Sequence, residues 1–74
     1  MNDFLKERIE QLKLRVVAYE DAVIGLAGGA QSYMLDTGQT KQSVTRYDIK
    51  MLEQNIEAML NQIYTYQDRL DGSG

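Results

Sequence analysis

Apolar residues recur along the first part of the chain, from about residue 3 to residue 27, at spacings that alternate between four and three. The positions are Leu5, Ile9, Leu12, Val16, Tyr19, Val23 and Leu26. This spacing predicts one face of a helix, with Asn2 or Asp3 capping its start. Further apolar residues widen the face in its second half, which indicates contact on more than one side. Gly28 and Gly29 predict the end of the helix, because glycine accepts positive φ after the last turn.

A second segment of the same kind runs from about Thr45 to Leu70. Its apolar positions are Ile49, Leu52, Ile56, Met59, Ile63, Tyr66 and Leu70. Thr45 followed three residues later by Asp48 indicates a capping box at the helix start, with Asp in place of the usual Glu or Gln. Two apolar stripes of equal length predict an antiparallel helix pair. The chain contains no proline, so both helices can run without interruption.

The segment between the helices, residues 31–44, is polar and predicts a short β-hairpin. Its strand-favouring residues are Tyr33, Leu35, Thr40 and Val44. The triplet Asp36-Thr37-Gly38 is typical of a turn, which places the tip at Asp36–Gln39. The predicted fold class is mostly α with α+β character: an antiparallel two-helix hairpin with a short β-hairpin inserted between the helices. One domain is expected over residues 1–70, followed by a disordered tail at residues 71–74.

Composition narrows the classes of function. The 74 residues include no Cys and no His, so disulfides, Cys/His zinc sites and imidazole acid–base pairs are impossible. We expect a protein that is not an enzyme, with no catalytic, cofactor-binding or metal-binding residues. A chain this short has a small core, and oligomerisation or docking on a partner is the remaining source of stability.

Charge and hydropathy bear on partners and location. The net charge of −3 offers no general attraction to nucleic acid. The longest apolar run is far shorter than a membrane span, so no membrane association is expected. The first residues alternate charges and lack the apolar core of a signal peptide. These features favour a cytosolic protein or a component of an assembled particle.

Candidate interface residues gather in and around the hairpin. The inserted segment is longer than the roughly 2–8 residues that usually join antiparallel helices, so we expect it to contact a partner. The alternative is that it only covers the open end of the helix pair. Tyrosine is enriched at interfaces, but ordinary surface also explains the exposed tyrosines. The candidates are Tyr33 and Met34 on opposite strand faces, Asp36, Lys41, Arg46, Tyr47 and Tyr64.

Two smaller features of the sequence lie outside these candidates. Ile24, Met51 and Leu60 lie outside the two stripes and leave room for a subunit interface. The tetrapeptide beginning at Leu35 matches the active-site motif of retroviral-type aspartic proteases. That motif requires an all-β scaffold that brings two copies together, whereas a hairpin turn explains the same residues here.

The order of helix, glycine-rich break, small hairpin and Thr-capped helix resembles the gpW family of phage head–tail joining proteins. The local matches are residues 28–33, the Asp36-Thr37-Gly38 turn and residues 43–49 with the Leu52-Glu53 pair. In that family the second helix begins with a Ser/Thr-rich segment and an acidic residue, which correspond here to Thr45 and Asp48. A Leu/Ile pair and a Glu follow, and they correspond to Ile49, Leu52 and Glu53. The resemblance covers roughly residues 10–65.

This resemblance implies a structural virion protein, a head completion or connector subunit. Such a subunit is monomeric alone and assembles as a homo-oligomeric ring, typically of twelve, beneath the portal protein. It extends the channel, lets double-stranded DNA pass without sequence-specific binding, and docks the adjacent connector or tail protein. Its location is the virion neck, with the host cytoplasm during assembly. The alternatives are a self-associating coiled-coil adaptor or chaperone, and a small phage-encoded inhibitor of a host protein.

Overall fold

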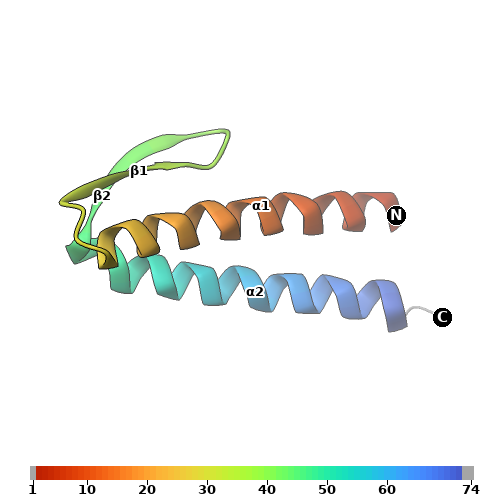
Figure 1. Cartoon of the computed structure of the whole chain (residues 1–74). Helices are drawn as coiled ribbons and strands as arrows, with labels where there is room; N and C mark the ends of the chain where they lie inside the picture. The colour runs from red at the N-terminus through yellow and green to blue at the C-terminus, as the bar shows by residue number, and fades with distance from the viewer. Residues whose placement is uncertain (1, 73–74) are drawn as a thin grey trace.

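A computed structural model describes residues 2–72 as two long antiparallel helices with a β-hairpin folded back on them (Figure 1). The elements are helix α1 (Asn2–Ala27), strands β1 (Ser32–Asp36) and β2 (Lys41–Thr45), the 3-10 turn η1 (Arg46–Asp48) and helix α2 (Ile49–Gly72). The molecule measures 48 by 20 by 14 Å. The predicted fold class, a helix pair with an inserted β-hairpin, is confirmed.

Both helix boundaries next to the hairpin follow from local hydrogen bonds. At the end of α1, the Ala30 N–H donates to the Gly25 carbonyl at 3.1 Å and the Gly29 N–H to the Leu26 carbonyl at 3.2 Å. These bonds form a Schellman motif, in which Gly29 takes a φ of 113°. Before α2, the Thr45 N–H donates to an Asp48 carboxylate oxygen at 2.8 Å. The predicted Thr–Asp pairing therefore exists, and it caps η1, which leads directly into α2.

Two boundaries differ from those predicted. Helix α2 continues to Gly72, so the first two residues of the predicted disordered tail are helical. The Gln67 side-chain amide donates to the Asp71 carboxylate at 3.3 Å across this last turn, which supports the extra residues. The other two tail residues, 73 and 74, lie outside the described residues. The hairpin turn lies one residue later than predicted, because Asp36 still pairs with Lys41 in the antiparallel register.

The core divides into two clusters along the helix pair. Every buried helical residue except Ala22 belongs to one of the two predicted stripes. The cluster far from the hairpin contains Ile9, Leu12, Val16, Met59 and Ile63. The cluster beneath the hairpin contains Ala22, Leu26, Leu35, Val44 and Leu52. The hairpin therefore contributes core residues from both of its strands.

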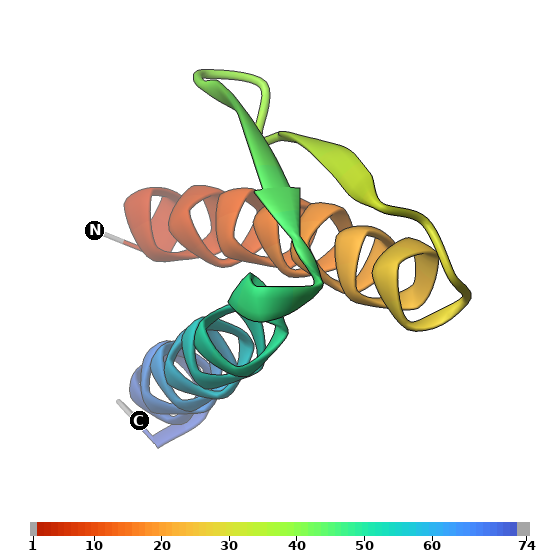
Figure 2. The ribbon, with the colours of Figure 1, turned by 90° about the vertical axis from the view of Figure 1, so that its left-hand side faces the viewer.

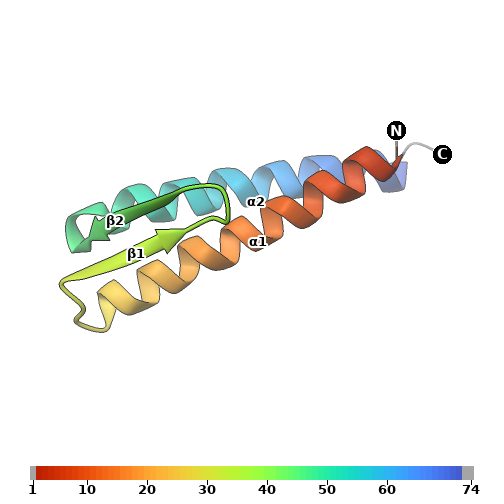
Figure 3. The same ribbon diagram turned by 90° about the horizontal axis from the view of Figure 1, so that it is seen from above.

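Small residues on α1 let the hairpin approach closely. Ala18, Ala22 and Gly25, spaced by four and three residues, share one face of the helix. Ala22 is completely buried, and a Cβ placed on Gly25 would lie 2.6 Å from a ring carbon of Tyr33. Seen from above, β1 runs along α1 and β2 lies toward α2 (Figure 3). Viewed along the molecule, the hairpin stands on one side of the helix pair (Figure 2).

Truncation of Leu52 tests the cluster beneath the hairpin. Leu52 is fully buried, so Leu52→Ala should lower the free energy of unfolding by about 2–5 kcal/mol. Leu14 is 71% exposed, and Leu14→Ala should change it by less than about 0.5 kcal/mol. Urea denaturation followed by circular dichroism measures both. Equal losses in the two variants would contradict the described core.

A double-mutant cycle tests the close contact between Gly25 and Tyr33. Alanine is favoured over glycine inside a helix by about 0.8–1.0 kcal/mol, but here the added methyl group meets the Tyr33 ring. Gly25→Ala should therefore destabilise the native protein and stabilise the Tyr33→Ala variant by about 1 kcal/mol. Urea denaturation measures the effect of Gly25→Ala on the free energy of unfolding in both backgrounds, and this effect should change sign between them. An identical effect in both backgrounds would show that the ring does not restrict this position.

Candidate functional site

The two candidates on β1 point to opposite faces of the hairpin, as predicted. Tyr33 is half-buried and packs against the cluster beneath the hairpin, with its ring over Gly25. Met34 points the other way and is 57% exposed. Tyr33 thus fixes the hairpin on α1, while Met34 is available to a partner.

Asp36 and Lys41 lie opposite each other at the base of the turn. The Gly38 N–H donates to the Asp36 carboxylate at 2.8 Å, and Gly38 has a φ of 88°. The Thr37 N–H donates to the Thr40 carbonyl at 3.0 Å and closes the turn. Asp36 therefore shapes the turn, as the Asp-Thr-Gly triplet indicated, and Lys41 is an exposed cation beside it.

Arg46 and Tyr47 form a pair at the foot of the hairpin, in η1. The Arg46 guanidinium carbon lies 5.3 Å from the centroid of the Tyr47 ring, a cation–π arrangement. Tyr47 is 83% exposed. The pair borders a hollow between the end of α1, the loop that follows it and η1. This end of the molecule thus presents an aromatic ring and a positive charge together.

Tyr64, the remaining candidate, lies on α2 and is exposed. The seven predicted residues consequently do not form one surface. Met34 and Asp36 of β1 lie beside α1, and Lys41 lies beside the hairpin turn. Arg46 and Tyr47 lie at the other end of the hairpin, where it joins α2, and Tyr64 lies far along α2.

A patch that the sequence prediction did not include lies beside β1. Leu14 and Val17 of α1 are both exposed and, with Met34, line a shallow hollow that also includes Asp21 and Asp36. We call Leu14, Val17 and Met34 the hairpin-side patch. The signal available in the sequence was the spacing of three between Leu14 and Val17, outside the main stripe of α1.

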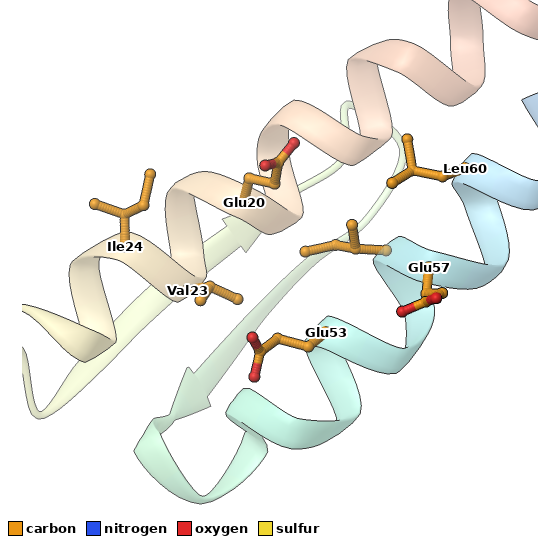
Figure 4. A pocket seen from close by; sticks show the side chains of 7 residues that line it. Glu20, Val23, Ile24, Glu53, Glu57 and Leu60 are labelled. Carbon is orange, nitrogen blue, oxygen red and sulfur yellow. The ribbon is translucent and has the colours of Figure 1, made fainter.

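A groove of about 280 Å³ lies between α1 and α2, with the hairpin behind it in Figure 4. Val23, Ile24, Ile56 and Leu60 supply its apolar lining, and Glu20, Glu53 and Glu57 supply carboxylates from both helices. We call these seven residues the acidic groove. Ile24 and Leu60 were expected to leave room for an interface, and both line it, whereas the third off-stripe residue, Met51, does not. The sequence prediction missed the three glutamates.

The glutamates of the groove have no cationic partner within residues 2–72. The one ion pair in this part of the chain joins Lys13 to Glu10 at 3.5 Å, on an exposed part of α1. No group of three or more acidic side chains in the same residues is placed to hold a metal ion. None of the described helices is both long and apolar enough to cross a membrane.

Comparison of the chain with protein-family models, with curated proteins and with solved structures found no match. The function is therefore inferred from the chain's own motifs and surfaces.

Proposed function

We propose that this protein is a structural subunit of a phage head–tail connector and acts by contact alone. The observation that carries the proposal is the exposure of large apolar side chains on a short two-helix fold. Leu14, Val17 and Ile24 of α1 and Met34 of β1 all lie outside the core and open to solvent. Exposed apolar surface of this kind is typical of protein–protein contact sites.

The connector assignment rests on the motifs that resemble the gpW family and on where the fold puts them. Thr45 and Asp48 are hydrogen-bonded at the start of the second helical segment, where the resemblance requires a cap. Leu52 of the Leu/Ile pair is buried beneath the hairpin. Glu53, which follows it, is exposed at the groove. Helix, hairpin and helix also occur in the expected order.

Helix α1 offers the best surface for contact between neighbouring subunits. Its inner stripe packs on α2, and its outer residues Leu14 and Val17 are also apolar. A helix that is apolar on several sides is normally buried on several sides. In a ring, such a face meets a different face of the next copy. The hairpin-side patch then lies between subunits, and the Arg46–Tyr47 pair at the foot of the hairpin meets the portal protein or the next connector or tail component.

A second candidate function is a self-associating coiled-coil adaptor or chaperone. The spacing of Leu14, Val17 and Ile24, three residues and then seven, favours it, because a second helix could pack along this line. The two functions differ in the solution mass of the isolated protein. A connector subunit is monomeric until it meets the portal, whereas a coiled-coil adaptor forms a stable dimer or tetramer at micromolar concentration.

Assembly with purified portal rings tests the proposed function. The protein alone should be monomeric and should join portal particles as a ring, as measured by mass and by electron microscopy. Leu14→Ser with Met34→Ser should keep the helical content and abolish ring formation, because both side chains are exposed in the hairpin-side patch. Phe4→Ser is the control: Phe4 is also exposed but is not among the residues lining this patch. A stable dimer of the protein alone, or rings formed equally by the double variant, would contradict the proposal.

The isolated subunit should not bind free duplex DNA at physiological salt. The net charge of −3 provides no counterion-release gain, and a channel through which DNA slides needs no tight phosphate contacts. Fluorescence anisotropy with a labelled duplex measures this, with a Lys-rich peptide as positive control. Salt-sensitive binding at micromolar concentration would be inconsistent with a channel of this kind.

A further inference from the structure

We propose that the acidic groove binds a basic amphipathic helix of a partner protein. This site differs from the hairpin-side patch and goes beyond the connector function proposed above. The inference rests on the apolar lining of the groove, on the carboxylates along both of its sides, and on the absence of cationic partners for them within residues 2–72.

The shape of the groove favours a helix as its occupant. It lies between two antiparallel helices, and Val23 of α1 and Leu60 of α2 point toward the space between them (Figure 4). A third helix laid into such a space packs its apolar stripe against both neighbours. Tyr64 follows Leu60 by one turn on the same face of α2 and lengthens the available surface. From Glu53 to Tyr64 the surface extends about 17 Å, or about three turns of a bound helix.

The charges determine the chemistry of that helix. Glu20 stands on α1, while Glu53 and Glu57 stand on α2, so carboxylates flank the apolar lining on both sides. A helix lying between them places its residues on either side of the apolar stripe close to these carboxylates. Lysine or arginine at those positions gains opposite-charge contacts, as at the flanking positions of coiled coils. Acidic residues there would be repelled.

The same charges disfavour a second copy of this chain related by a two-fold axis. In such a dimer the same surface meets itself, which brings the glutamates of one copy toward those of the other. No Lys or Arg lines the groove to offset that repulsion. On α1, Lys13 lies two turns from Glu20 and already pairs with Glu10. A two-fold dimer through the groove is thereby disfavoured, and the three glutamates make the groove complementary to a different, basic chain.

Synthetic peptides of about fourteen residues test this directly, since a helix of that length spans the groove. The probe carries Leu at two positions of each heptad, Lys at the flanking positions and Ala or Gln elsewhere. One comparison peptide replaces Lys by Glu, and a second keeps Lys but replaces Leu by Ser. Binding to the whole protein is measured by NMR titration and fluorescence anisotropy. The Leu/Lys peptide should bind, with shifts centred on residues 20–24 and 53–64, and neither comparison peptide should bind comparably.

Matched variants of the protein separate the groove from general charge. Glu20→Gln, Glu53→Gln and Glu57→Gln together should weaken binding about tenfold, the combined effect of losing three exposed charge contacts. The control triple Asp3→Asn, Glu7→Gln and Asp21→Asn removes the same charge from residues that do not line the groove and should change binding by less than about twofold. Ile24→Ser should weaken binding, whereas Phe4→Ser, equally 68% exposed, should not. Circular dichroism verifies the fold of each variant.

Three outcomes would overturn the proposal. The first is equal loss of affinity in both charge triples, and the second is binding that Ile24→Ser leaves unchanged. The third is a dimer of the protein that Ile24→Ser dissociates, which would assign the groove to a second copy. Ring formation with portal is a separate readout. Intact rings without peptide binding would overturn the groove proposal alone, and peptide binding without rings would overturn only the connector function.

Discussion

The fold depends on how closely the hairpin approaches α1. Two helices that pack only through their facing stripes bury little surface by themselves, and the hairpin enlarges the core with Leu35 and Val44. These side chains reach Leu52 because Ala22 and Gly25 leave room on α1. Larger residues at those two positions would lift the strands away from the helix pair. The hairpin is therefore a structural element as well as a candidate contact surface.

This one-sided packing explains why the remaining surfaces are unequal. The inward face of the hairpin is used for stability, so Tyr33 is half-buried against α1, whereas Met34 on the other face is exposed. The hairpin fills only one side of the helix pair, and the space on the other side remains open as the acidic groove. Ile24, which lines this groove, remains exposed for the same reason.

Local patterns were sufficient to predict the helices and their caps, because helical period and capping depend on residues only a few positions apart. The Gly28-Gly29 end and the Thr45–Asp48 start both lie where the pattern placed them. Surfaces built by distant residues were harder to predict. Glu20 comes near Glu53 and Glu57 only through the pairing of the two helices. The contact between Gly25 and Tyr33 likewise joins residues that lie eight positions apart, beyond the reach of a local pattern.

The antiparallel arrangement places the start of α1 and the end of α2 at the same end of the molecule, opposite the hairpin (Figures 1 and 3). Tension applied between residues 2 and 72 would therefore pull the two helices apart from one end and break the contacts between them one layer at a time. The cluster of Ile9, Leu12 and Ile63 would separate first, and the cluster beneath the hairpin last. A pull along the long axis between the hairpin and either helix end would instead shear many layers together. The molecule is thus mechanically weak in one direction and strong in another.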